Sequence, residues 1–479
     1  MQAGVDMHRE IFLRVAVFEY FSFKSILMNV HFIAMGGSVM HQLAIALKKK
    51  GYKVSGSDDD IFEPARTNLE KEGILPPAFG WFPEKINRDI DAVILGMHAR
   101  EDNPELRKAR ELGLNIYSFP EYIFQESTSK RRIVVGGSHG KTTTTAMIMH
   151  VLQHTSRQFD YLVGARLEGF DQSVQISDAP LIVCEGDEYP ASALEKKPKF
   201  HFLYPHIAIL TGIAWDHINV FPTFENYLEQ FAIFISRIEP GGVLIYNETD
   251  DELNMLIEKT ARQDIRYLPY GIPTHRVSEG RTRATFGSSS VDLKVFGDHN
   301  LLNMHAAWLA CQELGIGDDQ FTRAISSFTG ASRRLELLAQ NDESSIFRDF
   351  AHAPSKLKAT TQAVRNQFPD RKLVAVFELH TYSSLNENFL HEYENALDGA
   401  DEAVVFYSPH ALEIKRLPAM ENEKIKKGFA KEGLLVMTDR EELLAWLHSR
   451  NYQHANLLLM SSGNYDGIDV VKLAPELLK

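Results

Sequence analysis

The sequence is poor in cysteine and in long apolar runs, and each absence excludes a class of protein. Its 479 residues include only 2 cysteines, Cys184 and Cys311, which cannot form a disulfide framework. A reducing compartment follows, and we expect a cytoplasmic protein. No apolar run approaches the ~20 residues of a membrane span, so we expect no membrane partner.

Basic residues are also in short supply. The chain has 51 lysines and arginines against 64 aspartates and glutamates, a net charge of −13. Proteins that bind nucleic acids or anionic membranes usually present a basic surface, so we expect neither partner. A local basic pocket for a phosphate group is compatible with this charge.

The N-terminus lacks the features of a secretion signal. Residues 1–27 are partly apolar, but Arg9, Arg14, Glu19 and Lys24 interrupt the run, and no small-residue cleavage site follows. We therefore treat residues 1–27 as an N-terminal extension outside the fold and assign it no role.

What the sequence does contain is a repeated alternation of strand and helix patterns. This alternation predicts parallel sheets covered by helices, an α/β fold. At roughly 150 residues per domain, the length corresponds to about three domains. A polar linker at 126–132 and a second junction at 330–334 suggest the boundaries, and the composition of 262–296 predicts a small β segment.

The most specific single motif is GGSHGKTTTT, residues 136–145, between a predicted strand and a predicted helix. Glycines let backbone N–H groups converge on phosphate oxygens, and the helix N-terminus adds partial positive charge. Lys141 can reach the β- and γ-phosphates, and Thr142 can ligate Mg²⁺. The first glycine of the strict pattern falls at Val135, so this is a short variant. The alternative is a glycine-rich turn that happens to carry Lys-Thr.

Two further strands end in residues suited to a metal. The first is followed by Glu185, Asp187 and Glu188, and the second by Asp216 and His217. Ligands bind at the carboxyl ends of strands in open α/β sheets, and carboxylates suit Mg²⁺. A strand ending in acids is more often followed by a solvated loop, so only the order of the three motifs favours a nucleotide site.

Taken together, these motifs resemble those of the Mur ligase family, ATP-dependent amino-acid or peptide ligases of cell-wall synthesis. The resemblance runs in order from about Asn29 to the C-terminus. The matching segments are GSHGKTTTT (137–145), EGDEY (185–189), WDH (215–217), GDHNLLNMHAA (297–307), SRRLE (332–336) and DFAHAPS (349–355).

The resemblance implies three domains and a reaction. A Rossmann-like domain would bind a UDP-sugar (28–130), a central P-loop domain would bind ATP (131–330), and a Rossmann-like C-terminal domain would supply the amine (331–479). ATP and Mg²⁺ would convert the carboxylate of UDP-N-acetylmuramate into an acyl phosphate, which a free amine then attacks.

The resemblance also implies roles for individual residues. Catalysis is expected of Lys141, Asp349 and His352, and metal binding of Thr142, Glu185 and His217. ATP binding is expected of Gly137, Ser138, His139, Gly140, Lys141, Thr142, Thr143, Asn300, Asn303 and Arg334. UDP-sugar binding is expected of Gly36, Gly37, Ser38, Ser57 and Asp58.

Some of these residues could instead have a purely structural role. The two asparagines could be helix caps, Arg334 a surface salt-bridge former and His352 a structural histidine. Asp58 could equally mark a dinucleotide site.

Two kinds of family member use UDP-N-acetylmuramate itself, one adding L-alanine and the other the murein tripeptide L-Ala-γ-D-Glu-meso-diaminopimelate. The segments at 187–200 and 460–467 resemble the tripeptide enzymes, while FELHTYSS (377–384) also resembles the alanine enzymes. We predict the tripeptide as partner, with L-alanine as the alternative.

Some positions depart from the family pattern. Ala34 replaces the first glycine of the N-terminal turn, Gly212 an asparagine, and Arg348 an aspartate. Phe231 stands where some members carry a carbamylated lysine.

Two alternatives come from other classes of protein. An NAD-dependent oxidoreductase would leave the segment 141–145 unexplained. A UDP-sugar-binding protein without ATPase function would not need Lys141, Glu185 and His217.

Overall fold

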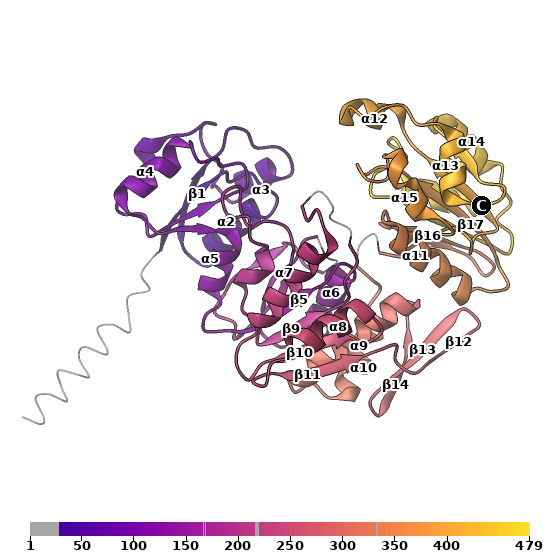
Figure 1. Ribbon diagram of the computed structural model, residues 1–479, viewed down its shortest axis with the longest axis horizontal. Coiled ribbons are helices and arrows are strands. Elements are labelled where there is room, and N and C mark those ends of the chain that lie inside the picture. The colour runs from indigo at the N-terminus through magenta and orange to yellow at the C-terminus, as the bar shows by residue number, and fades with distance from the viewer. Residues whose placement is uncertain (1–27, 166, 168, 216–219, 332–333) are drawn as a thin grey trace, which may run out of the picture. The chain divides into compact units, whose positions relative to one another are not determined.

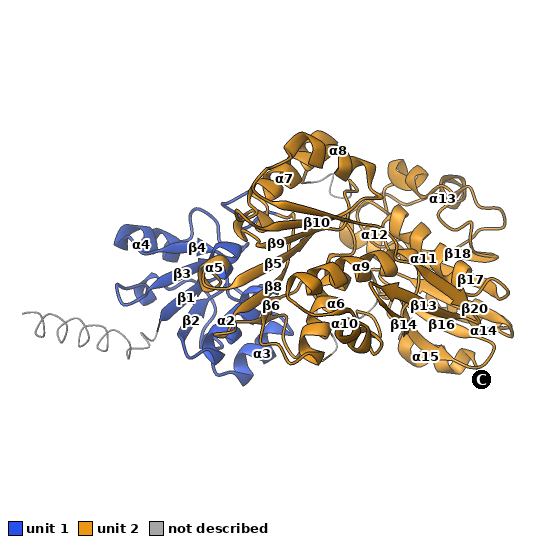
Figure 2. Ribbon diagram, turned by 90° about the horizontal axis from the view of Figure 1, so that it is seen from below, with its two compact units in different colours: residues 1–123, 190–196 blue, residues 124–189, 197–479 orange. Residues whose placement is uncertain are grey.

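A computed structural model describes residues 28–165, 167, 169–215, 220–331 and 334–479 (Figure 1). Within them, strands alternate with helices and form four sheets, which confirms the predicted α/β class. The chain divides into two compact units (Figure 2). The first comprises the residues up to Ile123 together with Pro190–Lys196, and the second comprises Phe124–Tyr189 and Lys197–Lys479.

The first unit is built on a parallel sheet of order β2-β1-β3-β4. Its strands are β1 (Asn29–Ile33), β2 (Lys53–Ser57), β3 (Ala92–Leu95) and β4 (Ile116–Ser118). Its helices are α2 (Met40–Lys49), α3 (Ala65–Lys71), α4 (Pro104–Leu112) and the start of α5 (Phe119–Glu126), with a 3₁₀ turn at Pro83–Lys85. Helix α4 shows why such elements form. Asn103 caps its first N–H groups, Pro104 opens it, and Gly113 ends it at φ 69°.

The central part of the second unit holds a seven-stranded sheet of order β11-β10-β9-β5-β8-β6-β7, parallel except for β7. Its strands are β5 (Arg131–Gly136), β6 (Asp160–Leu162), β7 (Val174–Gln175), β8 (Leu181–Glu185), β9 (Ile207–Leu210), β10 (Val243–Asn247) and β11 (Arg266–Tyr270). Its helices are α6 (Lys141–His154), α7 (Phe224–Ser236), α8 (Asp251–Thr260), α9 (Asp298–Glu313) and α10 (Asp318–Ile325), with a 3₁₀ turn at Lys199–Phe202. Because β8 and β9 flank β5, the segments that follow these three strands emerge at one edge of the sheet.

The predicted small β segment is confirmed as a three-stranded antiparallel sheet, β12 (His275–Ser278), β13 (Arg281–Phe286) and β14 (Ser289–Leu293). It follows the last strand of the central sheet and precedes α9.

The C-terminal part of the second unit holds a six-stranded sheet of order β15-β16-β20-β17-β18-β19. Its strands are β15 (Glu336–Gln340), β16 (Ser345–Asp349), β17 (Lys372–Glu378), β18 (Glu402–Phe406), β19 (Leu435–Met437) and β20 (Ala455–Met460). Its helices are α11 (Pro354–Gln367), α12 (Pro409–Lys415), α13 (Asn422–Phe429), α14 (Arg440–His448) and α15 (Val470–Leu477), with a 3₁₀ segment at Glu387–Tyr393. Two apolar clusters pack against this sheet, one centred on Phe377 and the other on Val376, neighbours that point to opposite faces.

The predicted boundaries fall between sheets, since the first sheet ends at Ser118, the second starts at Arg131, and the last starts at Glu336. The central and C-terminal parts nevertheless belong to one compact unit, so a division into three domains at 130 and 330 stays a prediction. Among the described residues, no helix combines the length and apolarity needed to cross a membrane.

Candidate active site

The predicted phosphate loop joins β5 to α6, so it lies between a strand and a helix as expected. Gly137 and Gly140 adopt φ values of 121° and 83°, a left-handed region that side chains disfavour. A Cβ on Gly140 would lie 2.2 Å from Asn303 Oδ1, so glycine is required there by space as well. The loop therefore reaches the first turn of α6 with its backbone close to α9.

Lys141, the first residue of α6, points into an acidic environment. Its Nζ donates to the Glu188 carboxylate at 2.9 and 3.1 Å and to Gly137 O at 2.5 Å. Burial alone would lower the pKa of Lys141, but the fully buried Glu188 carboxylate outweighs that effect and holds the pKa above its ordinary value. Lys141 is therefore a cation over the whole neutral range.

Two of the three predicted metal ligands lie side by side. Thr142 Oγ1 donates to Glu185 Oε1 at 2.8 Å, and Gly164 N donates to Glu185 Oε2 at 2.9 Å. A hydroxyl and a carboxylate oxygen at this spacing suit Mg²⁺. The third predicted ligand, His217, lies outside the described residues, and within the described ranges no group of three acidic, histidine or cysteine side chains could hold a metal.

A cavity of about 420 Å³ joins the phosphate loop to residues from the C-terminal sheet. The predicted residues Arg334, Asp349 and His352 all line it. Asp349 Oδ2 accepts from Leu335 N at 2.5 Å and its Oδ1 from Ala351 N at 2.7 Å. Burial raises the pKa of Asp349 although Arg334 opposes the shift. In this arrangement Asp349 organises the backbone around the two other side chains.

Asn300 and Asn303 lie on α9 and also line this cavity. The Asn300 side-chain amide donates to Phe296 O at 2.8 Å, so part of its hydrogen-bonding capacity serves the fold. Asn303 lies against Gly140. The structure thus places both at the cavity, and a role in reading adenine stays a prediction.

His139 connects the phosphate loop to α11. Its Nε2 lies 2.9 Å from Ser355 Oγ, a contact between residues 216 positions apart. Burial, followed by the charges of Lys356 and Lys141, lowers the pKa of His139 well below its ordinary value. The imidazole is therefore neutral at physiological pH.

Other residues of this cavity were given no role in it by sequence reasoning, although several lie inside the matching segments. The additional lining residues include Asp187, Glu188, Tyr189, Thr211, His299, Leu302, Ser355, Lys356, Ala359 and Thr360. Glu188 was visible as an acid after a strand, but its role as the partner of Lys141 was not. Thr211 and Lys356 follow no recognised pattern, because their positions depend on the packing of segments far apart in sequence.

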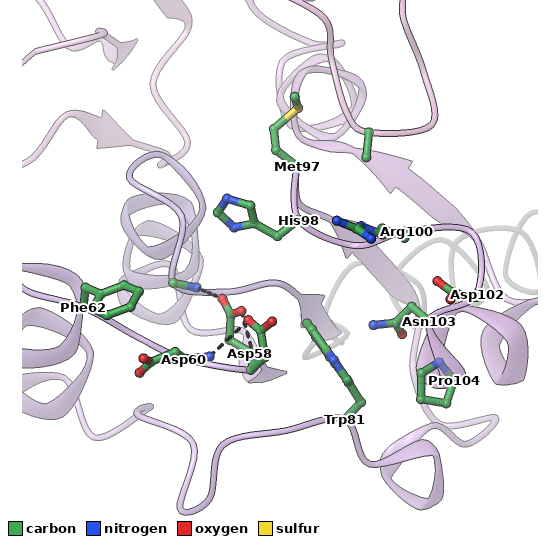
Figure 3. A pocket seen from close by; sticks show the side chains of 13 residues that line it. Asp58, Asp60, Phe62, Trp81, Met97, His98, Arg100, Asp102, Asn103 and Pro104 are labelled. Carbon is green, nitrogen blue, oxygen red and sulfur yellow. Dashed lines mark hydrogen bonds between the residues drawn. The ribbon is translucent and has the colours of Figure 1, made fainter. Parts of the chain in front are cut away.

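The first unit has a cavity of its own, of about 800 Å³ (Figure 3). Of the five residues predicted to bind a UDP-sugar, Gly36 and Asp58 line it, whereas Gly37, Ser38 and Ser57 do not. Asp58 Oδ2 accepts from Gly36 N at 2.6 Å, and burial raises the pKa of Asp58 to about 6.

Other side chains in the same cavity were missed by sequence reasoning. Trp81, His98 and Arg100 surround it in Figure 3, Trp81 from the loop after α3 and the other two from the loop after β3. Ala193, from the segment that returns to this unit, lines it as well. An aromatic ring and two basic side chains suit a base and a phosphate group.

Three family models match successive parts of the chain. They are the Mur ligase family catalytic domain at 29–128, the Mur ligase middle domain at 135–311 and the Mur ligase glutamate ligase domain at 333–463. The chain belongs to the Mur ligase family. Members of this family are ATP-dependent ligases that form amide bonds, so this Mur ligase is an enzyme of peptidoglycan synthesis and not an oxidoreductase.

Curated relatives match most of its length. A UDP-N-acetylmuramate–L-alanine ligase of Aquifex aeolicus is 28% identical over 451 residues, covering 91% of this chain and 94% of the relative. The enzyme of the same name from Paenarthrobacter aurescens is 32% identical over 387 residues, covering 79% and 82%.

Solved structures support the fold of this Mur ligase. UDP-N-acetylmuramate–alanine ligase from Thermotoga maritima matches with a TM-score of 0.64 at 23% identity, covering 94% of this chain and 98% of that one. A murein peptide ligase from Psychrobacter arcticus matches with a TM-score of 0.60 at 21% identity and the same coverage. Both support the fold of the Mur ligase family.

Proposed function

We propose that this Mur ligase couples the carboxylate of UDP-N-acetylmuramate to L-alanine at the expense of ATP. The observation that carries the ligase chemistry is the cavity shared by Lys141 and Arg334, which brings a phosphate loop and the C-terminal sheet together. The choice of amine follows the curated relatives, since two of them that span most of this chain are named as L-alanine ligases. This choice favours our alternative over the tripeptide.

The residues of the cavity suit phosphoryl transfer, which depends on positioning and charge neutralisation. The backbone of the loop would hold phosphate oxygens, and Lys141 would turn from Glu188 toward the γ-phosphate. Thr142 and Glu185 would hold Mg²⁺, which supplies further positive charge when bound. Arg334, which lines the same cavity, would contribute a further positive charge.

The cavity of the first unit would bind the UDP-sugar. Trp81 offers a ring face to the base, and Arg100 and His98 offer donors to the diphosphate. Gly36 and Asp58 would form the floor beside them.

A second candidate amine is the murein tripeptide L-Ala-γ-D-Glu-meso-diaminopimelate. The specific observation in its favour is the sequence of segments 187–200 and 460–467, which resemble the tripeptide enzymes. The first of these segments supplies Asp187 and Glu188 to the ATP cavity and Ala193 to the UDP-sugar cavity.

Phosphate release from ATP tests both candidates. With UDP-N-acetylmuramate present, L-alanine should stimulate release with the higher kcat/KM, and mass spectrometry should show the coupled product. A kcat/KM at least ~10-fold higher for the tripeptide would reverse the choice, because unpaired groups in a site built for a longer substrate cost at least that much. If neither L-alanine nor the tripeptide stimulates phosphate release, the proposed ligase activity is contradicted.

A further inference from the structure

Tyr227 is a fully buried residue of α7 that sequence reasoning did not single out. Its ring packs between Phe221, with centroids 5.3 Å apart, and Phe231, with centroids 5.1 Å apart in an edge-on arrangement. Aromatic packing of this kind fixes the ring. The hydroxyl at its end is consequently held at one place.

The hydroxyl of Tyr227 contacts Ser138 of the predicted phosphate loop and the carboxylate of Glu188. The Tyr227 hydroxyl lies 2.8 Å from Ser138 Oγ and 3.5 Å from Glu188 Oε1. Ser138 Oγ in turn accepts from Ala214 N at 2.8 Å. A carboxylate can only accept, so Tyr227 is the donor in its 3.5 Å contact with Glu188, whereas either hydroxyl can donate in the 2.8 Å contact with Ser138.

These hydrogen bonds connect three segments around the predicted phosphate loop. Ser138 belongs to the loop that would hold phosphates, and Glu188 is the carboxylate that holds Lys141. Ala214 lies on the segment that follows β9. When Lys141 turns toward a phosphate, the buried Glu188 carboxylate loses its contact with a cation, and the Tyr227 hydroxyl remains beside it as a donor.

We infer that Tyr227 is a positioning residue that sets the phosphate loop and Lys141 for ATP. The inference rests on the proposed function of the loop and goes beyond it, since Tyr227 lies outside the residues that line the cavity. Its hydroxyl acts through Ser138 and Glu188 and not on the substrate itself.

The variant Tyr227→Phe removes the hydroxyl and keeps the ring. We expect its kcat and its affinity for Mg·ATP each to fall by about 10-fold or more, because small misplacements at a phosphoryl-transfer site are costly. The KM for UDP-N-acetylmuramate should stay unchanged. Steady-state kinetics and titration calorimetry with Mg·ATP measure these quantities.

Tyr452→Phe is the matched control. Tyr452 is also buried, and its hydroxyl donates to Leu447 O at 3.0 Å in the C-terminal sheet region. Both variants should lower the melting temperature by similar amounts, but Tyr452→Phe should keep parental kcat and ATP affinity.

The outcomes separate this inference from the proposed function. An active parent with an equally active and equally tight-binding Tyr227→Phe variant would overturn the positioning role alone. If the parent turns over neither amine, calorimetry with Mg·ATP still decides the role of Tyr227. A parent that binds no Mg·ATP would overturn both the proposed function and this inference.

Discussion

At the residue scale, the ion pair between Lys141 and Glu188 is the feature with the largest expected effect. The Lys141 side chain is 14% exposed and that of Glu188 is 1% exposed. Removing one partner of a buried pair leaves the other charge without compensation. The predicted catalytic residue Lys141 thus also contributes to the stability of the region around the central sheet.

Lys141→Ala should therefore have two effects. Turnover should fall by at least ~10²-fold, because a charge aimed at the transferring phosphoryl group is lost. The free energy of unfolding should fall by about 3–5 kcal/mol, because Glu188 is left buried and charged. The double variant Lys141→Ala with Glu188→Gln should recover much of the stability in denaturant titrations without recovering turnover. Recovered turnover would contradict the assignment.

A second residue-scale prediction concerns Ala34, which replaces a glycine of the family pattern. Its φ is 65°, in the left-handed region, where a Cβ costs roughly 1–2 kcal/mol. Replacing Ala34 by glycine would relieve this strain, but the greater freedom of glycine in the unfolded chain offsets part of the stabilisation. Ala34→Gly should thus stabilise the protein by up to ~1 kcal/mol in chemical denaturation. A destabilised variant would show that the Ala34 methyl group contributes packing that exceeds the strain.

The raised pKa of Asp58 gives a third prediction. Because its pKa rises from 3.8 to about 6, mainly through burial, the folded protein binds more protons than the unfolded chain between these pH values. The contribution of Asp58 to stability is therefore present below pH 4 and is lost as pH rises through about 6. The melting temperature of the parent relative to Asp58→Asn should fall from pH 4.5 to pH 7, and a constant difference would contradict the shift.

At the element scale, the turn between β5 and α6 sets the shape of the predicted phosphate loop. Its two glycines provide the backbone shape, and Gly140 also makes room for Asn303 of α9. The loop and α9 are therefore fitted to each other, although about 160 residues separate them in the sequence.

Gly140→Ala should abolish Mg·ATP binding and destabilise the protein by about 1–3 kcal/mol, since the new Cβ would meet Asn303 Oδ1 at 2.2 Å. Gly315→Ala is the matched control, because Gly315 also has positive φ, 75°, but no atom within 4 Å of the added Cβ. Gly315→Ala should lose only the stability that the backbone strain costs, and its affinity for Mg·ATP in calorimetry should equal that of the parent. Equal ATP affinity in both variants would contradict the fit between loop and helix.

At the scale of the whole molecule, the segment Pro190–Lys196 leaves the second unit and belongs to the first. It places Ala193 at the cavity proposed for the UDP-sugar. The neighbouring Leu194 packs against the apolar cluster of the first unit. The segment Pro190–Lys196 thus contributes to a cavity that is lined mainly by residues before 105.

Ala193→Trp should fill part of that cavity and raise the KM for UDP-N-acetylmuramate by about 10-fold or more, while Mg·ATP affinity stays parental. Lys196→Trp is the control in the same segment, since Lys196 is exposed and does not line the cavity. An unchanged KM in Ala193→Trp would place the UDP-sugar elsewhere.

The sequence by itself determined the α/β class, the phosphate loop before α6 and the family. These depend on local patterns, namely a strand, a glycine turn and a lysine at the first position of a helix, and such patterns need no knowledge of distant contacts. The N-terminal turn was only partly predictable. Of the residues that the family resemblance implied, Gly36 and Asp58 line the cavity of the first unit, but Gly37, Ser38 and Ser57 do not.

Only the tertiary structure decided which side chains meet. It paired Lys141 with Glu188, brought Ser355 to His139, and set the Tyr227 hydroxyl behind the phosphate loop. The physical reason is that these contacts join residues 47, 216 and 89 positions apart. They arise from the order of strands in a sheet and from the packing of helices on it, which leave no periodic signal in the sequence.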